Sequence, residues 1–114
     1  MIAAQPIVET GFPHIDTVVR RIVETSSPVG VLLFGSYARG EQRPDSDMDL
    51  LVVVPDEIVQ KRAHGAMLRR SVSGVPMSMD LVVVRRSELE RWRNVKGLVY
   101  REAVNEGKVL FGVV

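Results

Sequence analysis

Gly35-Ser36-Tyr37-Ala38-Arg39-Gly40 and, a few residues later, Ser46-Asp47-Met48-Asp49-Leu50 each lie beside a short apolar run. The run Val31–Phe34 precedes the first segment, and the run Leu50–Val54 follows the second. Side chains alternate between the two faces of a strand with a period of two. Asp47 and Asp49 therefore point to the same side if this part of the chain is extended. The pattern predicts two buried strands, a glycine-serine turn after the first, and two carboxylates at the start of the second.

Two carboxylates on one face of a strand need a partner. At a separation of about 4 Å, two like charges repel by roughly 4 kcal/mol in a partly shielded medium. Such a pair usually shares a proton or holds a cation. Nearby, Gly35 would let the backbone approach a ligand closely, and Ser36 adds a hydroxyl beside free backbone amides. The two segments together predict a phosphate site next to a metal site.

A third carboxylate follows at Asp80, which opens another apolar run, Leu81–Val84. A glycine-serine turn, two aspartates one residue apart and a third aspartate on a later strand resemble the DNA polymerase β-type nucleotidyltransferases. The similarity is to their small branch, the minimal nucleotidyltransferases (MNT), and it extends over residues 29–111. In fold, the resemblance implies the α/β (α+β) core of that superfamily, a single mixed β-sheet flanked by helices.

The resemblance also implies a role for each residue of the two segments. In this family the turn, here Gly35 and Ser36, holds the β- and γ-phosphates of a nucleoside triphosphate such as ATP. Asp47 and Asp49 would bind two Mg²⁺ ions, and Asp80 would complete the shell of the second ion and accept a proton. Arg39 is close enough in sequence to contact the triphosphate, but a surface ion pair is an open alternative for it.

Length and composition set the limits of the function. The chain has 114 residues, no cysteine and a net charge of +1. It is expected to form one domain over residues 1–114, with residues 1–11 as a loose lead-in. No apolar run reaches the roughly 18 residues that would span a bilayer, so a cytoplasmic protein without membrane contact is expected. The near balance of 15 basic and 14 acidic residues does not favour a general nucleic-acid-binding surface.

Periodicity and capping signals predict the remaining elements. Apolar residues at helical spacing after Pro13 predict a helix that ends near Ser26. Ser87 and Glu90 form a capping-box pattern at the start of a later helix. Further helices are expected over residues 56–71 and 95–106, the last one ending at Gly107. Strands are expected over residues 29–34, 48–54, 75–84 and 108–111.

The sequence ends at Val114, directly after the expected core, and this position suggests where the acceptor of the transferred group would be held. Larger relatives use an additional helical domain to hold the acceptor, so this chain is expected to borrow that wall from another protein. The resemblance to MNT antitoxins implies transfer of AMP from ATP to a side chain, typically tyrosine, of a HEPN-type toxin in a hetero-oligomer. Two alternatives stay open: a binding module of the same fold without catalysis, and an aminoglycoside-type nucleotidyltransferase acting on small molecules.

Overall fold

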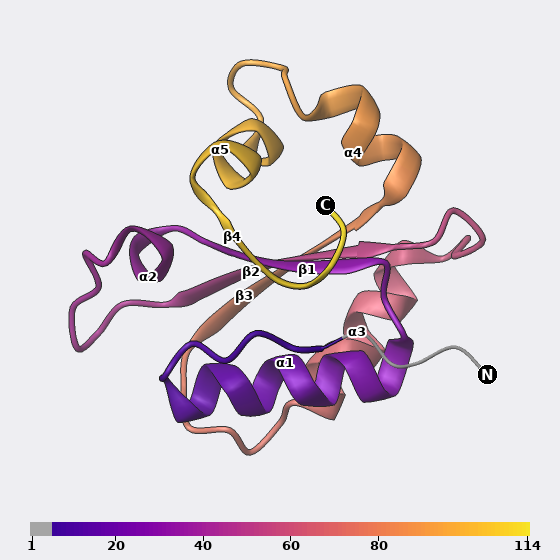
Figure 1. Cartoon of the computed structure of the whole chain (residues 1–114). Coiled ribbons are helices and arrows are strands. Elements are labelled where there is room, and N and C mark those ends of the chain that lie inside the picture. Colours follow the sequence, from indigo (N-terminus) through magenta and orange to yellow (C-terminus); the bar gives the residue numbers. More distant parts are fainter. Residues whose placement is uncertain (1–5) are drawn as a thin grey trace.

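A four-stranded sheet forms the centre of the protein in a computed structural model that describes residues 6–114 (Figure 1). Its strands are β1 (Gly30–Phe34), β2 (Met48–Val54), β3 (Met79–Arg85) and β4 (Lys108–Gly112). Their spatial order is β3-β2-β1-β4. β1 is antiparallel to both β2 and β4, whereas β2 and β3 are parallel. The expected single mixed sheet is therefore confirmed.

Helices cover both faces of this sheet. α1 (Pro13–Ser26) and α3 (Lys61–Ser71) lie on one face, and α4 (Arg86–Trp92) and α5 (Val99–Glu106) lie on the other (Figure 1). The short helix α2 (Ser36–Arg39) follows β1 directly. No helix within residues 6–114 combines the length and the apolar character needed to cross a membrane.

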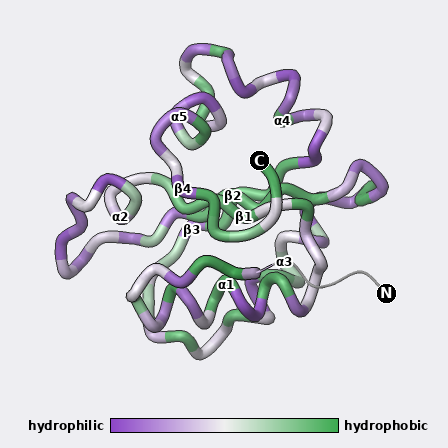
Figure 2. Tube along the Cα trace, in the orientation of Figure 1, coloured by the Kyte–Doolittle hydropathy of each residue, from purple (hydrophilic) through white to green (hydrophobic). Residues whose placement is uncertain are grey.

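Two apolar layers hold the helices against the sheet, and Figure 2 shows hydrophobic residues concentrated along β1 and β2. The buried stripe of α1 packs with alternate residues of β1 and β2, including Leu33 and Leu50. The intervening strand residues, such as Leu32 and Leu51, pack with Leu89 of α4 and Ala103 of α5. Complete burial of one such aliphatic side chain contributes about 1.5–3 kcal/mol. The predicted helix after Pro13 and the two-sided burial of the central strands are confirmed.

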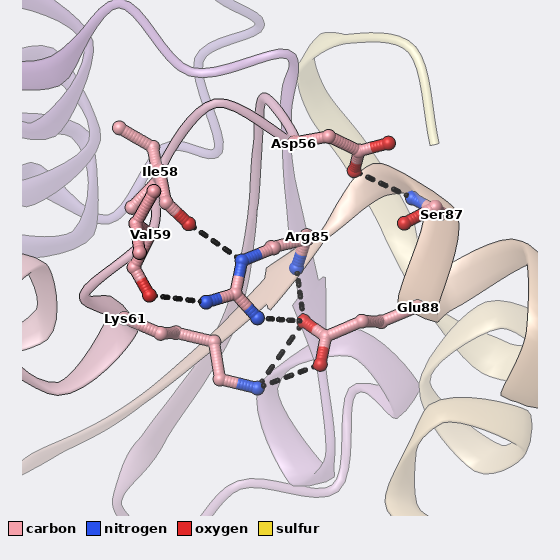
Figure 3. Close-up of polar contacts among 7 residues, drawn as sticks. All are labelled: Asp56, Ile58, Val59, Lys61, Arg85, Ser87 and Glu88. Atoms are coloured by element: carbon pink, nitrogen blue, oxygen red, sulfur yellow. Dashed lines mark hydrogen bonds and ion pairs between the residues drawn. The ribbon is translucent and has the colours of Figure 1, made fainter.

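The expected helix over residues 56–71 begins only at Lys61, because the preceding backbone bonds to other elements. The carboxylate of Asp56 accepts a hydrogen bond of 3.0 Å from the backbone N–H of Ser87. Arg85 donates to the carbonyl oxygens of Ile58 and Val59, at 2.5 and 2.6 Å (Figure 3). Val59 is 80% exposed. These contacts with β3 and α4 keep residues 56–60 in a non-helical connection.

The capping pair of α4 also differs from the expected Ser87 and Glu90. The helix begins at Arg86, and the carboxylate of Glu88 accepts the backbone N–H of Arg85 at 2.9 Å. The same carboxylate pairs with the Lys61 ammonium at 3.2 Å and the Arg85 guanidinium at 3.3 Å (Figure 3). Glu88 caps the helix because folding brings Lys61 of α3 next to its carboxylate. The local sequence pattern does not reveal this contact.

β3 and α5 each begin later in the chain than expected. β3 begins at Met79 rather than at residue 75, because it pairs with Met48, the first residue of β2. α5 begins at Val99 after a turn in which Gly97 has a φ of +86°. Gly107 follows it as the predicted C-cap. Residues 6–11 carry no helix or strand, and residues 1–5 of the expected lead-in lie outside the described residues.

Replacing Glu88 by glutamine should lower the free energy of unfolding by about 1–2 kcal/mol, the range for losing a cap and its charged hydrogen bonds. Burial alone would raise the pKa of Glu88, but the Arg85 N–H and the Lys61 ammonium outweigh it and hold the pKa below its usual value. The stabilisation is therefore present above the unfolded-state pKa and is lost as the pH falls through the lower folded-state pKa.

Urea unfolding at neutral and acidic pH measures this difference. Glu90→Gln is the control, because Glu90 is exposed and its ion pair is with Arg93, directly after the end of α4. A Glu88→Gln deficit that persists unchanged at low pH would contradict the assignment of the effect to the carboxylate charge.

Candidate active site

The pairing register of the sheet brings two of the predicted aspartates together. Asp49 on β2 is the direct register partner of Asp80 on β3, and Phe34 of β1 is its partner on the other side. Register partners in neighbouring strands point to the same face of a sheet. Asp49 and Asp80 thus lie on the face that α5 covers. Asp47 precedes β2 by one residue and lines the same pocket.

That pocket has a volume of about 420 Å³ and contains every residue that the sequence singled out for the site: Gly35, Ser36, Arg39, Asp47, Asp49 and Asp80. They come from the β1–α2 turn, the start of β2 and the start of β3. Among the lining residues that were not predicted, Val99 and Glu102 come from α5. The sequence around these two residues does not indicate a site, because they come near the aspartates only when α5 packs on the sheet.

Gly35 is required by the close approach of Asp49. Its φ of +73° and ψ of −155° are outside the regions that residues with a side chain normally adopt. A Cβ atom at this position would stand 2.2 Å from Oδ2 of Asp49. The absence of a side chain therefore lets the carboxylate lie directly against the backbone of the turn.

The charges of the three aspartates converge on this pocket. The pKa of Asp49 is raised above its ordinary value, first by burial and then by the charges of Asp80 and Asp47. Asp47 and Asp80 are exposed, so their carboxylates face solvent. A divalent cation would relieve this repulsion, and carboxylate oxygens are the ligand type that Mg²⁺ prefers.

Within residues 6–114, no three acidic or histidine side chains stand close enough, as placed, to enclose a metal ion. The two exposed aspartates can change between staggered rotamers, and a change of χ1 rotamer redirects the carboxylate. The donor set therefore fits Mg²⁺ in its chemistry, and closure around an ion requires these side chains to turn.

Arg39 also lines the pocket, but its guanidinium is engaged by three glutamates. It donates to Glu106 of α5 at 2.8 Å, and lies 3.2 Å from Glu41 and 3.8 Å from Glu102. Both alternatives for Arg39 thus have a structural basis: it lines the pocket of the aspartates and it forms surface ion pairs. These pairs connect the α2 turn to α5.

Comparisons with known proteins agree with this geometry. The sequence pattern of the family described as nucleotidyltransferase domain matches residues 15–110. No curated protein sequence gives a match.

Several solved structures share the fold. A toxin–antitoxin complex with AMP-PNP is 25% identical, with a TM-score of 0.61, and the match covers 86% of this chain and 73% of that one. A candidate nucleotidyltransferase from Sulfolobus solfataricus is 22% identical, with a TM-score of 0.58 and coverage of 85% and 76%. The toxin–antitoxin MntA–HpeT with two Asp-to-Glu changes is 23% identical, with a TM-score of 0.57 and coverage of 89% and 73%.

The family match covers most of the chain, including the glycine-serine turn and all three aspartates. The sheet and the flanking helices fit the fold of the solved structures. The chain belongs to the nucleotidyltransferase domain family.

Proposed function

We propose that this protein transfers AMP from ATP, with Mg²⁺, to a hydroxyl group on a side chain of a partner protein. The observation that carries the proposal is the gathering of Asp47, Asp49 and Asp80 in one pocket with the Gly35–Ser36 turn. Family membership supports the transferase chemistry, and the AMP-PNP in a similar toxin–antitoxin structure supports an adenine nucleotide.

The Gly35–Ser36 turn and the three aspartates each have a part in this reaction. The Ser36 hydroxyl and nearby backbone N–H groups bind the β- and γ-phosphates, which Gly35 allows to approach the main chain. Asp47 and Asp49 hold the ions, with Asp80 as the third ligand on the acceptor side. Mg²⁺, when bound, neutralises phosphate charge and lowers the pKa of the attacking hydroxyl.

The transfer forms one bond and breaks one. The acceptor oxygen attacks the α-phosphorus, the bond from that phosphorus to the β-phosphate oxygen breaks, and pyrophosphate leaves. Asp80 takes the proton of the acceptor hydroxyl. The protein's main contributions are to position the reactants and to place charge where the transition state needs it.

The partner we propose is a HEPN-type toxin, which this chain would inactivate as its antitoxin in the cytoplasm. The similar MntA–HpeT structures are toxin–antitoxin complexes, which supports a protein partner. Incubation of the chain with ATP, Mg²⁺ and the product of the adjacent gene tests the proposal by mass spectrometry. A mass increase of one AMP on the partner is expected.

The same experiment separates the competing functions. Partner inhibition without any mass increase would overturn the transfer and favour a binding module that acts by occlusion. Labelling of an aminoglycoside, with none on the partner, would favour the small-molecule enzyme. Three carboxylates gathered in one pocket support catalysis over occlusion, because occlusion alone gives no reason for that charge.

Asp80→Asn should lower the transfer rate at least about 100-fold while changing the dissociation constant for MgATP less than about fivefold. The reason is that Asp80 serves the acceptor side of the reaction, whereas the triphosphate is held at Gly35, Ser36 and the other aspartates. Single-turnover rates and calorimetric titration with MgATP measure the two effects. Equal losses of binding and rate would contradict an acceptor-side role.

Glu106→Gln should tighten ATP binding about two- to fivefold. It releases the Arg39 guanidinium from its closest partner, at 2.8 Å, and an exposed ion pair of this kind is weak. The guanidinium keeps its contacts with Glu41 and Glu102, but it is more available to pair with a phosphate oxygen. Calorimetric titration measures the change, with Glu90→Gln as a control that removes one carboxylate elsewhere. Unchanged or weaker ATP binding would leave Arg39 as a structural ion pair only.

A further inference from the structure

A second pocket, of about 300 Å³, lies between α3 and β3, the strand at one edge of the sheet. Its lining residues are Lys61, Arg62, Gly65, Arg69 and Val83. We call it the basic pocket, because its charged lining residues are lysine and arginine, which are cations at neutral pH. A concave surface lined by charges of one sign attracts a ligand of the opposite sign. The lining therefore favours an anion.

The basic pocket and the pocket of the aspartates lie on opposite faces of the sheet. Val83 lines the basic pocket, whereas the preceding residue, Val82, lines the pocket of the aspartates. Successive residues of a strand point to opposite faces. In agreement, α3 and α5 lie on opposite sides of the sheet (Figure 1). An anion in the basic pocket is therefore a different ligand from the triphosphate of the proposed reaction.

Gly65 forms the floor of the basic pocket, with a cation one helical turn away on either side. One face of α3 presents Lys61, Gly65 and Arg69, which are four residues apart. Helical side chains lean toward the N-terminus, so the Arg69 side chain lies back over Gly65. A Cβ atom at Gly65 would stand 3.2 Å from Nη1 of Arg69 and 3.6 Å from Cγ2 of Val83. The missing side chain thus leaves room under the guanidinium.

Neighbouring elements hold the two cations at the ends of this face. The Lys61 ammonium lies 3.2 Å from the carboxylate of Glu88 (Figure 3). Nη2 of Arg69 donates to the carbonyl oxygen of Leu81 on β3 at 3.2 Å. This bond also covers part of the sheet edge. Because one end of the Arg69 guanidinium is fixed, its other N–H groups are positioned before a ligand arrives.

The two arginines of the pocket carry charge that no carboxylate offsets. Within residues 6–114, neither Arg62 nor Arg69 forms an ion pair. Glu88 offsets the charge of Lys61 and is itself shared with Arg85. The two guanidinium charges are therefore left for a ligand. A phosphomonoester, with a charge of about −1.5 to −2 at pH 7, matches them better than a singly charged carboxylate does.

We propose that the basic pocket binds the phosphate group of a small phosphomonoester. The guanidinium groups of Arg62 and Arg69 pair with the phosphate oxygens above Gly65, in the forked geometry that arginine offers to phosphate. The apolar wall at Val83 contacts the organic part of the ligand. The volume is near the lower end of the roughly 300–1,000 Å³ range of small-molecule pockets. A nucleic-acid strand matches less well, because it carries one negative charge per phosphate.

NMR titration of the full chain with glycerol 3-phosphate, at constant ionic strength, tests this assignment. The backbone amide signals of Gly65 and Val83 are expected to shift until they saturate. Acetate at the same ionic strength should bind at least about tenfold more weakly, because it carries half the charge and one fewer oxygen pair for the arginines. Equal affinity for the two anions would overturn the proposal, since it would indicate a general attraction of anions to this surface.

Two charge variants locate the binding. Arg62→Gln should weaken the binding of glycerol 3-phosphate at least about fivefold, because it removes a charged hydrogen-bond donor that has no ion pair in the fold. Arg70→Gln is the matched control: Arg70 is exposed on the same helix and does not line the pocket. Its affinity should stay within about twofold of the parent, since salt screens an exposed charge outside the pocket. Equal losses in the two variants would overturn the proposal.

Gly65→Ala tests the shape of the pocket without changing any charge. The new Cβ occupies the floor and crowds Nη1 of Arg69 at 3.2 Å, so binding should weaken at least about threefold while α3 keeps its helical signals. An alanine variant that binds glycerol 3-phosphate as tightly as the parent would overturn the proposal, because diffuse charge would then explain the binding.

Single-stranded RNA without a terminal phosphate distinguishes the source of the phosphate group. We expect it to bind more weakly than glycerol 3-phosphate at the same ionic strength. Tighter binding of the RNA, weakened equally by Arg62→Gln and Arg70→Gln, would overturn the phosphomonoester site and identify the face of α3 as a nucleic-acid surface.

Discussion

Asp49→Ala should reduce AMP transfer by well over 100-fold, which exceeds the 10–100-fold losses typical of residues that only support metal ligands. Asp49 occupies the centre of the pocket, in register with Asp80 and against the backbone of Gly35. In the proposed reaction, its removal would take away carboxylate oxygens that hold the Mg²⁺ ions. Initial rates with labelled ATP and the partner protein measure the loss. Asp47→Ala is expected to fall into the same range.

A second substitution separates charge from shape. Asp49→Asn keeps the side chain's size but removes the charge that burial and two neighbouring aspartates disfavour. In the absence of metal it should leave the fold as stable as the parent or more stable, while transfer is lost. Urea unfolding in the presence of a chelator measures stability. This pairing of higher stability with lower activity is typical of residues retained for function.

Glu57→Ala is the matched control, because Glu57 is an exposed acid in the connection after β2 and lines none of the pockets described above. Its transfer rate should stay within twofold of the parent. If Asp49→Ala kept a near-normal rate, the assignment of Asp49 to metal binding would be wrong. The proposed reaction would then need a different set of carboxylates.

The site residues that could be predicted from the sequence are those that belong to a local sequence pattern. The alternation of Asp47 and Asp49 with apolar residues placed both on one side of a strand, and Asp80 opened an apolar run in the same way as Asp49. Parallel pairing of β2 with β3 then aligned Asp49 with Asp80. The direction of these side chains follows from the period of the strand alone, so it can be predicted without knowledge of contacts between distant segments.

The parts that the sequence did not predict depend on contacts between distant segments. Glu102 reaches the pocket because the neighbouring Ala103 packs α5 against the central strands. In the same way, Glu88 caps α4 where Ser87 and Glu90 had the better local pattern, because Lys61 arrives from α3. Local capping preferences are worth about 1 kcal/mol, and a tertiary ion pair of similar size is enough to override them.

Gly35→Ala should abolish productive nucleotide binding and reduce transfer at least about 100-fold. The new Cβ would stand 2.2 Å from Oδ2 of Asp49, so the turn or the carboxylate must move. A displacement of about 1 Å in a reacting group can cost about 100-fold in rate. The backbone conformation is also one that only glycine adopts easily, so a stability loss of about 1–3 kcal/mol is expected.

Gly40→Ala provides the comparison that assigns the effect. Gly40 ends α2 with the same φ of +73°, but no atom lies within 4 Å of the position that its Cβ would take. It should therefore cost about 1–2 kcal/mol of stability through its left-handed backbone and leave MgATP binding and transfer close to normal. Calorimetric titration and unfolding of both variants measure the contrast. Equal losses of activity in the two would mean that the rigidity of the turn matters, and that the contact between Gly35 and Asp49 does not.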